Sequence, residues 1–393
     1  MNEITDVNIV EIIEKAIDRS KWEKFIFSDL FENVVEKVVP KNSGLEHYIG
    51  LEHLDSGSLH IKRFGDTSSL IGDKLKIYKG DIIFAKRNAY LKRASIAPFD
   101  AVASAHSLVL RPKEKNVLPE FIPFFLMSEK FWERAIEISV GSLSPTINWK
   151  SLAKQEFLLP PKDQQAQLAE LLWAMDEVIE EEKELLNKIH LSFKSELKSE
   201  YQNKSVKLVR LKDKLDLSTG KRMKGGGLSD GDVLSIGGEN IDNFGNLIFE
   251  KKLFISEEFF MQMKNGKIEE NDILMMKDGA KTGKIAFVDK DIKAATNEHL
   301  FIIRARKKYY IQKYLFYFFL SDFGQMQIQN FFHGIIGGVT RDDIFDIKVP
   351  NQTLEKQNFV VSKFDEYRKS IREIELKIQS SQSLQKSLIN QVF

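Results

Sequence analysis

Two long stretches of the chain place apolar side chains at helical spacing, and each follows a short apolar segment that ends in proline. The first follows Pro160–Pro161 and repeats apolar residues at intervals of four and three from Leu168 to Leu197. The second follows Pro350 and has the same spacing from Phe364 to Val392. A stripe this narrow is typical of a helix that pairs with another helix, and not of one wrapped by a core. Polar residues interrupt the two stripes at Glu182, Ser381 and Gln385.

Ahead of each predicted helix, the hydrophobic pattern changes to short apolar runs bounded by Gly, Asn and Asp, which is typical of β-strands. The runs "GDIIFAK" and "NDILMMK" come from the two halves of the chain, as do "HSLVLRP" and "HLFIIRA". Residues 119–136 and 311–328 have amphipathic helical spacing, so we expect each of them to form one helix. Each half is therefore predicted to be a mostly-β module with small helices.

These elements recur in the same order about 190 positions apart, which indicates an internal repeat. Asp81 in the first half corresponds to Asp272 in the second, and His106 corresponds to His299. The segments "YIGLEHL" and "SIGGENI" form a third matched pair, and "GSLSPTINWKSL" and "GIIGGVTRDDI" form a fourth. We therefore expect one module to be present twice, with each copy followed by its own long helix.

The predicted fold class is α+β, with two similar, mostly-β modules joined by two long coiled-coil helices. Antiparallel pairing of the helices would bury both apolar stripes and give a pseudo-twofold arrangement. A helix of roughly 35 residues is about 50 Å long. Residues 7–17 suit one amphipathic helix. The expected segments are an N-terminal extension at 1–20, a first module at 21–160, a helix at 161–203, a second module at 204–350 and a helix at 351–393.

The composition predicts a soluble, cytoplasmic protein and excludes several kinds of site. Of 393 residues, 42% are hydrophobic and 29% are charged, and none is cysteine. The chain therefore has no disulfide, thiolate metal site or cysteine nucleophile. No apolar run approaches the roughly 18–20 residues of a membrane span, and the first residues lack a secretory signal pattern. Because the net charge is only +1, nucleic-acid binding would need basic residues that are concentrated locally.

The duplicated layout resembles the specificity subunit of type I restriction–modification systems, which serve host defence. The resemblance extends from about Trp22 onward. It is carried by the two "IG" segments, by "GDIIFAKRNA" and "NDILMMKDGAKTGK", by "GSLSPTIN" and "GGVTRDDI", and by the two proline junctions. It implies a subunit without catalytic activity, in which each target-recognition domain binds one half of a bipartite site in double-stranded DNA. It also implies that the paired helices set the half-site separation and bind two modification (methyltransferase) subunits that methylate adenine. Restriction or translocase subunits are further partners implied by the family.

Two features depart from the pattern of that family. The second helix begins with "NQTLEKQ", which contains Gln357, and does not repeat the double proline and the Gln-Gln pair of residues 160–165. Residues 1–20 form an additional segment to which the sequence assigns no role.

A search for catalytic motifs supports a protein without an active site. An adenine methyltransferase needs a glycine-rich cofactor loop and an Asn/Asp-Pro-Pro-aromatic motif, but Pro160–Pro161 is flanked by leucine and lysine. A phosphate-binding loop needs four residues between its glycines, whereas three separate Gly279 from Gly283. The seven histidines form no HExxH motif. We therefore predict no metal and no cofactor, although a metal-dependent nuclease stays an alternative because its motifs are degenerate.

Basic residues are concentrated where the two modules resemble each other. Between Asp81 and Asp100 there are four basic residues and no acid, and between Lys204 and Lys224 basic residues outnumber acidic ones. Lys and Arg supply the phosphate contacts that dominate DNA affinity, so these loops are predicted to contact DNA. The alternative is an ordinary solvated loop. The candidate residues are Lys86, Arg87, Asn88, Tyr90, Lys92, Arg93, Ser142, Ser144 and Thr146 in the first half, and Lys221, Arg222, Lys224, Lys277, Lys281, Lys284, Asn297, His299 and Arg341 in the second.

Within this set, the candidates for base readout are Arg87, Asn88, Arg222, Asn297, His299 and Arg341. Arginine forms bidentate hydrogen bonds with guanine, and asparagine with adenine. Tyr90 suits stacking on a base as well as packing within its own loop. Ser142, Ser144 and Thr146 suit phosphate contacts as well as turn and cap positions.

The helix junctions carry aromatic residues that are candidates for partner binding. Trp173 and Phe359 are expected to contact the modification subunits, with a place in the core as the alternative for Trp173. Two other functions stay open at this point: a self-sufficient restriction or modification enzyme, and a scaffold that binds partners but not DNA.

Overall fold

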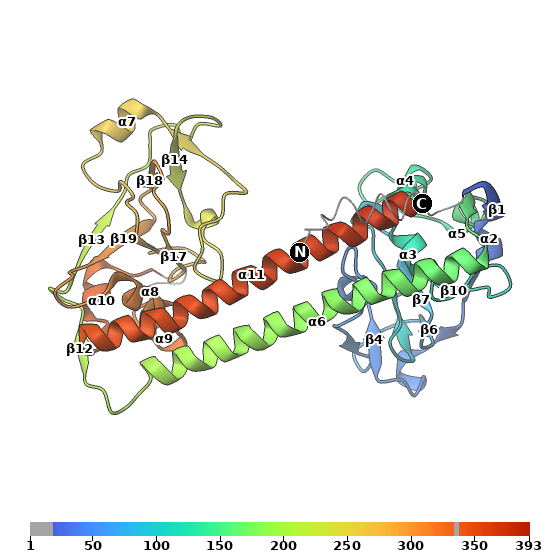
Figure 1. The fold of residues 1–393 in the computed structure, drawn as a ribbon, viewed down its shortest axis with the longest axis horizontal. Helices are drawn as coiled ribbons and strands as arrows, with labels where there is room; N and C mark the ends of the chain where they lie inside the picture. Colours follow the sequence, from blue (N-terminus) through green and yellow to red (C-terminus); the bar gives the residue numbers. More distant parts are fainter. Residues whose placement is uncertain (1–18, 334–337) are drawn as a thin grey trace, which may run out of the picture. The chain divides into compact units, whose positions relative to one another are not determined.

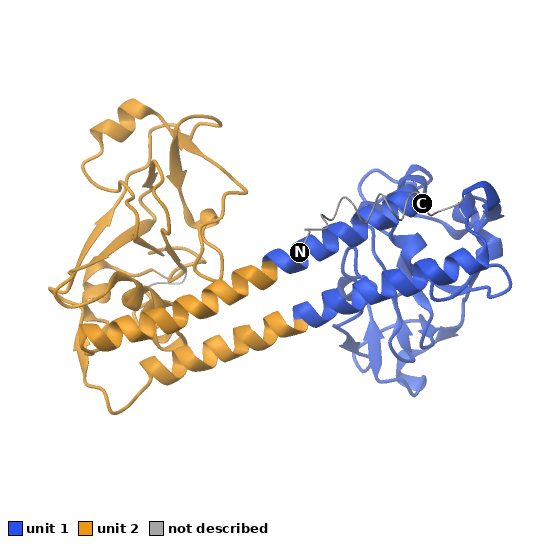
Figure 2. Ribbon diagram, in the orientation of Figure 1, with its two compact units in different colours: residues 1–183, 376–393 blue, residues 184–375 orange. Residues whose placement is uncertain are grey.

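The computed structural model describes residues 19–333 and 338–393, which form two compact units (Figures 1 and 2). Unit 1 comprises residues 1–183 and 376–393, and unit 2 comprises residues 184–375. Each unit holds one sheet-rich module and part of both long helices, α6 (Lys162–Tyr201) and α11 (Leu354–Val392). The predicted α+β class, with two similar modules and two long helices, is confirmed. The helix predicted at residues 7–17 lies outside the described residues.

Unit 1 contains a four-stranded sheet of order β2-β10-β7-β8, a five-stranded sheet of order β3-β6-β9-β4-β5, and a separate β1-β11 pair. Strand β7 lies between two neighbours and is buried along its whole length, which explains its continuous apolar sequence. The strands are β1 (Glu23–Ile26), β2 (Phe31–Asn33), β3 (Lys37–Val38), β4 (His47–Ile49), β5 (Gly65–Asp66), β6 (Lys74–Ile77), β7 (Ile82–Ala85), β8 (Ala94–Ile96), β9 (Ala101–Ala103), β10 (Ser107–Pro112) and β11 (Glu156–Leu159). The short helices are η1 (Arg19–Lys21), α2 (Phe27–Leu30), η2 (Pro40–Asn42), η3 (Leu51–His53), η4 (Ala89–Leu91), α3 (Ile122–Met127), α4 (Glu129–Glu137) and α5 (Trp149–Leu152).

Unit 2 repeats part of this topology, although its second sheet has three strands, of order β15-β14-β18, in place of five. The sheet β13-β19-β16-β17 has the strand order of β2-β10-β7-β8, and the parallel pair β14-β18 repeats the parallel pair β4-β9. The strands are β12 (Leu208–Arg210), β13 (Leu215–Thr219), β14 (Val233–Ile236), β15 (Phe254–Ile255), β16 (Ile273–Met276), β17 (Ile285–Phe287), β18 (Ala294–Thr296), β19 (Leu300–Ala305) and β20 (Lys348–Pro350). The short helices are η5 (Gly238–Asn240), α7 (Glu257–Gln262), α8 (Gln312–Leu320), α9 (Asp322–Gln329) and α10 (Arg341–Asp346).

A buried aspartate joins the two central strands of each four-stranded sheet. Asp81 at the start of β7 accepts two hydrogen bonds from Arg111 of β10, at 2.8 and 2.9 Å. Asp272 and Arg304 form the same pair between β16 and β19, at 2.6 and 2.8 Å. Both aspartates are 2% exposed, and an unpaired carboxylate at such a site would be strongly destabilising. The matched aspartates of the sequence are thus structural residues.

The two amphipathic segments form helix pairs, which corrects the expectation of one helix each. Residues 119–136 are split into α3 and α4 at Ser128, and residues 311–328 into α8 and α9 at Ser321. Each serine has extended backbone, and its hydroxyl accepts the N–H of the residue three positions on in the following helix. Each hydroxyl also donates to a carbonyl of the preceding helix. A serine that caps one helix and bonds to the last turn of another produces a break without proline or glycine.

The module cores extend onto the long helices, which corrects one part of the coiled-coil prediction. In unit 1, Leu168 and Leu172 of α6 and Leu388 of α11 lie in the same buried cluster as the phenylalanines of the module. In unit 2, Phe193 of α6 and Phe364 of α11 lie in the module core in the same way. The apolar stripes are therefore wrapped at their ends by module cores, and are not a helix–helix seam along their whole length.

Within each unit, α6 and α11 run antiparallel, as predicted. In unit 1, Gln385 donates to the Leu172 carbonyl at 3.4 Å, and Lys377 Nζ lies 2.9 Å from the carboxylate of Glu182. Glu182 is 6% exposed and Gln385 is 5% exposed, so these two polar interruptions face the partner helix, whereas Ser381 is half-buried. In unit 2 the contacts follow the same antiparallel order, through the ion pairs Lys363–Glu196 and Lys356–Glu200.

A buried glutamine secures each junction between strand and long helix. Gln165 Nε2 donates to Pro160 O at 2.9 Å, and its Oε1 accepts the Leu118 N–H at 2.8 Å. Gln357 makes the equivalent bonds in unit 2, to Gln352 O at 3.0 Å and from an N–H of the loop before α8 at 2.8 Å. The second junction therefore uses the same interaction as the first, although its sequence departs from the family pattern.

Replacing Gln165 with Leu is expected to lower the free energy of unfolding of unit 1 by about 2–4 kcal/mol, because a buried N–H and a buried carbonyl lose their partner. All four tryptophans lie in unit 1, so tryptophan fluorescence during urea unfolding follows this unit. The exposed Gln167 of the same helix provides the control, and its replacement with Leu should change the stability by less than about 0.5 kcal/mol. Equal effects of the two substitutions would contradict the prediction.

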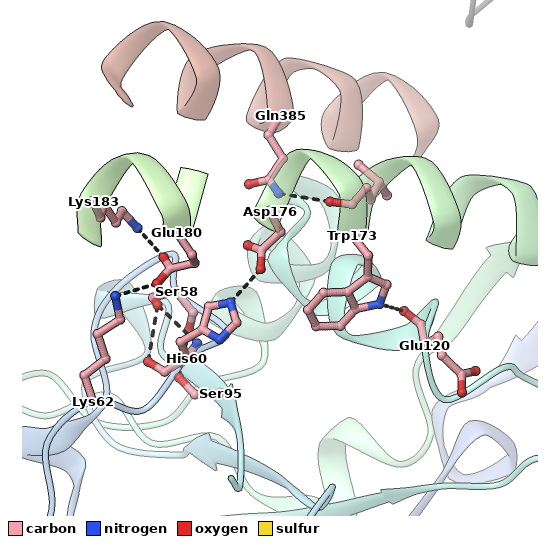
Figure 3. A network of polar contacts seen from close by, with 11 residues as sticks. Ser58, His60, Lys62, Ser95, Glu120, Trp173, Asp176, Glu180, Lys183 and Gln385 are labelled. Carbon is pink, nitrogen blue, oxygen red and sulfur yellow. Dashed lines mark hydrogen bonds and ion pairs between the residues drawn. The ribbon is translucent and has the colours of Figure 1, made fainter. Parts of the chain in front are cut away.

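A second group of polar contacts joins the loop between η3 and β5 to α6 (Figure 3). His60 Nε2 lies 2.5 Å from Asp176 Oδ2, and Lys62 Nζ lies 2.5 Å from the Glu180 carboxylate. The hydrogen bond to Asp176 raises the pKa of His60; burial opposes this shift, and Glu180 adds to it. Because Asp176 is mostly buried, the loop is held against the helix by a charge-assisted bond.

Replacing His60 with Gln is expected to destabilise unit 1 by about 1 kcal/mol near pH 6, where a charge-assisted bond at a half-exposed site is lost. A raised histidine pKa contributes stability that is fully present below the unfolded value of about 6.5 and is lost as pH rises through the folded value. Tryptophan-detected unfolding should therefore show a difference between wild type and variant that shrinks between about pH 6 and pH 9. A difference that does not depend on pH would refute this role.

Candidate nucleic-acid interface

The candidate interface of unit 1 forms where three loops meet at the end of β7. Lys86 directly follows this strand; its N–H donates to His106 O at 3.3 Å, and its carbonyl accepts the Ile147 N–H at 2.8 Å. The next residue, Arg87, forms an isolated β-bridge with Thr146. These bonds bring together the β7–β8 loop, the β9–β10 loop and the turn before α5. We call this arrangement the platform of unit 1.

The platform of unit 1 is positively charged. Arg87 is exposed, and its Nη1 lies 3.4 Å from His106 Nε2. Burial lowers the pKa of His106, and the charges of Arg87 and Lys86 lower it further, as does Lys74. Burial and the charge of Arg87 also lower the pKa of Lys86. The positive charges thus oppose one another, and an anion placed over them would relieve this repulsion.

The loop after Arg87 is held in a defined conformation. Asn88 and Lys92, on either side of η4, both adopt the left-handed conformation, with φ of 54° and 47°. The Ser144 hydroxyl donates to Asn88 Oδ1 at 2.9 Å and so connects this loop to the turn before α5. Tyr90, which lies between Asn88 and Lys92 in the sequence, is 57% exposed, and Ser142 is exposed as well. These candidates therefore lie together around the platform.

Three candidate phosphate contacts of unit 1 have partners inside the module. Lys92 forms an ion pair with Glu129, and Arg93 Nη1 donates to Leu51 O at 2.6 Å. The Nε of Arg93 is buried without a partner in the described part of the chain. Lys86 Nζ donates to Ala105 O at 2.9 Å. Arg87, which is exposed, is therefore the best-placed cation of this loop, and DNA contact by Lys86, Lys92 and Arg93 stays a prediction.

Unit 2 repeats the platform with the same backbone bonds. The Lys277 N–H donates to His299 O at 3.0 Å, and the Lys277 carbonyl accepts the Val339 N–H at 2.7 Å. Asp278 occupies the position of Arg87 and forms the corresponding bridge to Gly338. The two platforms thus share a backbone arrangement and differ in the side chains that they present.

The charges on the platform of unit 2 are paired. His299 Nδ1 lies 2.6 Å from Asp278 Oδ1, and Arg222 Nη2 lies 3.2 Å from His299 Nε2. Arg222 Nε is 3.1 Å from the Glu298 carboxylate, and Asn297 Oδ1 accepts the His299 N–H at 2.9 Å. Where unit 1 presents uncompensated cations, unit 2 presents a network of alternating charge.

The remaining candidates of unit 2 lie on loops of differing exposure. Gly220 permits the basic loop after β13, because an added Cβ would lie 1.7 Å from the Thr296 carbonyl oxygen. Arg341 Nη2 donates to Leu217 O at 2.8 Å, so one of its donors is used inside the module. Lys284 is partly buried. The exposed lysines of this group are Lys221, Lys224 and Lys281.

Sequence reasoning missed two features of the unit 1 platform. His106 is bonded to Lys86 as His299 is to Lys277, and the alignment of the two halves was the available signal. Leu143 is 96% exposed at the tip of the turn before α5, and no pattern in the sequence distinguishes it from a buried leucine.

The two aromatic candidates for partner binding differ in their surroundings. The Trp173 indole N–H donates to Glu120 O at 2.8 Å (Figure 3). Its ring packs on Phe124, with 4.9 Å between the ring centroids. Phe359 is 64% exposed, with Lys356 Nζ 5.0 Å from its ring centre. Trp173 therefore has a packing role in unit 1, and partner binding by either residue stays a prediction.

Within residues 19–333 and 338–393, no group of three or more His, Asp or Glu side chains is arranged to hold a metal ion. The helices of this part also include none that is long and apolar enough to cross a membrane.

The chain matches a known family in both halves. The family model described as "Type I restriction modification DNA specificity domain" matches residues 19–191 and 203–381. The chain is also similar to the "Type I restriction enzyme MjaVIII specificity subunit" of Methanocaldococcus jannaschii. The two are 22% identical over 309 residues, which cover 72% of this chain and 70% of that protein.

Two solved structures share the fold over nearly the whole chain. One is the S subunit of the type I restriction–modification system of M. genitalium, with a TM-score of 0.56 and 15% identity, covering 95% of this chain and 96% of that one. The other belongs to a study of complex assembly and conformational transition in the type I R-M system, with a TM-score of 0.58 and 16% identity, covering 95% and 97%. The family model matches each half of the chain, and the two matched segments together span most of the sequence. The chain therefore belongs to the specificity subunits of type I restriction–modification systems.

Proposed function

We propose that each module of the chain binds one half of a bipartite site in double-stranded DNA. The observation that carries this proposal is the repeated platform, in which Lys86 and Lys277 make the same backbone bonds while their neighbours differ. Two modules that share a fold but recognise different DNA sequences need a common scaffold and different base contacts. Arg87 and Asp278, at equivalent positions, are such a difference.

In unit 1, the platform suits a phosphate next to a base edge. Burial and neighbouring positive charges disfavour the protonated forms of Lys86 and His106, and a nearby phosphate oxygen would favour both. Arg87 is exposed at the same junction, and an arginine fork matches the O6 and N7 acceptors of guanine. Asn88, held in the left-handed conformation, is a second candidate for base contact.

In unit 2, the platform suits a different half-site. The carboxylates of Asp278 and Glu298 lie beside Arg222 and the His299 ring. A carboxylate accepts a hydrogen bond from the exocyclic amino group of cytosine, whereas it repels phosphate. We therefore assign fewer phosphate contacts and more base contacts to the platform of unit 2 than to the platform of unit 1.

The partners of the chain follow from its family. We propose that the paired helices set the separation of the half-sites and bind two modification subunits, with Phe359 and the exposed edge of Trp173 as contact candidates. Restriction or translocase subunits would join through that complex, and the DNA target places the assembly in the cytoplasm. The chain itself would contribute recognition without catalysis.

The test is DNA binding by the chain in complex with its modification subunits, measured by fluorescence anisotropy on a selected duplex. Arg87→Ala is expected to weaken binding by about tenfold or more and to relax the preference at one base pair of one half-site only. Lys86→Ala should weaken binding to all sequences alike and reduce the slope of log affinity against log salt by about one.

Lys24→Ala, on the separate β1–β11 pair, is the matched control and should leave affinity and salt dependence unchanged. Loss of preference in both half-sites after Arg87→Ala would contradict one module per half-site. Cleavage or methylation of DNA by the isolated chain would favour the alternative of a self-sufficient enzyme, and absence of DNA binding by the complex would favour the scaffold.

DNA affinity should also depend on pH through His106. Its pKa is lowered in the free protein, and a nearby phosphate would raise it, so binding takes up a proton. Affinity is therefore expected to be highest below the pKa of the free protein and to fall as pH rises through the pKa of the complex. His106→Asn should flatten the profile between about pH 5 and pH 8, measured at constant salt. An unchanged profile would exclude a phosphate beside this ring.

A further inference from the structure

Among the described residues, Leu143 is the most exposed large hydrophobic side chain, at 96%. It lies in the turn closed by Val140 and Thr146, and Val140 is itself 66% exposed. Tyr90, in the neighbouring loop, is 57% exposed. A single exposed leucine is ordinary on a protein surface, so its meaning depends on what holds it and what surrounds it.

The turn that carries Leu143 is rigidly connected. Val140 and Thr146 exchange two backbone hydrogen bonds of 3.0 and 2.9 Å, and the Thr146 hydroxyl donates to Ser144 O at 3.0 Å. The Ser144 hydroxyl in turn donates to Asn88 Oδ1 at 2.9 Å. An apolar side chain presented by a turn that is already ordered loses little conformational entropy when it binds.

The turn is also attached to the positive platform of unit 1. Thr146 forms its bridge with Arg87, and the next residue after Thr146 donates its N–H to the Lys86 carbonyl. Leu143 is therefore an apolar tip joined to a surface whose cations oppose one another. Charge complementarity identifies the occupant of this surface as a polyanion, and the apolar tip requires that this polyanion offer an apolar group.

Duplex DNA has two kinds of apolar target. One is the C5-methyl group of thymine, which lies open in the major groove. The other is the gap between stacked base pairs. The free energy needed to unstack a base step is larger than the free energy gained by burying one leucine side chain. We propose that Leu143 reads a thymine methyl group in the half-site bound by unit 1. This inference rests on the proposed function and names one base feature that it recognises.

The test replaces thymine by deoxyuridine, one position at a time, in the half-site of unit 1. This change removes one methyl group and leaves every hydrogen bond intact. The wild-type complex is expected to lose about fourfold in affinity at one position. Leu143→Ala should weaken binding to the thymine duplex by about fourfold to tenfold and should no longer respond to deoxyuridine at that position. Leu143→Met, which keeps an apolar side chain, should retain the response.

Met261→Ala, which removes a 67%-exposed apolar side chain from α7 of unit 2, is the matched control and should respond to deoxyuridine in the half-site of unit 1 as the wild type does. The melting temperature of Leu143→Ala should equal that of the wild type, since the side chain is almost fully exposed. A wild-type complex that prefers its site but ignores every deoxyuridine overturns the proposal, as does an equal response in Leu143→Ala. Increased fluorescence of 2-aminopurine next to the site would show insertion between bases and would overturn it too. A wild-type complex without any sequence preference would instead refute the proposed function.

Discussion

Each module of this chain completes its hydrophobic core with side chains from both long helices. In unit 1, Leu172 of α6 and Leu388 of α11 are buried among the phenylalanines of the module, and unit 2 uses Phe193 and Phe364 in the same way. Burial of apolar area is the largest favourable term in folding, so a module separated from the helix pair would expose much of its core. The orientation of each module on its helices is therefore set by core packing and not by a linker.

The same constraint explains the polar contacts at the ends of the helices. Gln165 and Gln357 bond the strand-to-helix junctions to the loop before each helical hairpin, and both are almost fully buried. His60 and Asp176 add a charged contact between a module loop and α6 in unit 1. A bonded junction limits relative motion of module and helix within its unit, which matters for a protein whose recognition depends on the placement of a few side chains.

In both platforms the backbone forms the shared scaffold, whereas the side chains differ and can provide the specificity. Backbone N–H and carbonyl groups of Lys86 and Lys277 make equivalent bonds, and backbone bonds place few restrictions on the side chains nearby. The electrostatics of the two surfaces can therefore diverge, and they do, since Arg87 is replaced by Asp278. A platform with positive charge favours phosphate, whereas a platform of mixed charge favours the hydrogen-bond donors and acceptors of base edges.

The sequence alone determined the duplication, the fold class and the two antiparallel helices, because periodicity and matched motifs are properties of the chain order. It also located the basic loops, but it could not separate Arg87 from Lys92, since an ion pair with Glu129 depends on residues that only folding brings close. The break at Ser128, the wrapping of the helix ends by module cores and the exposure of Leu143 were likewise decided by tertiary structure. In each case the physical reason is the same: burial and pairing are properties of neighbours in space, and the sequence lists only neighbours along the chain.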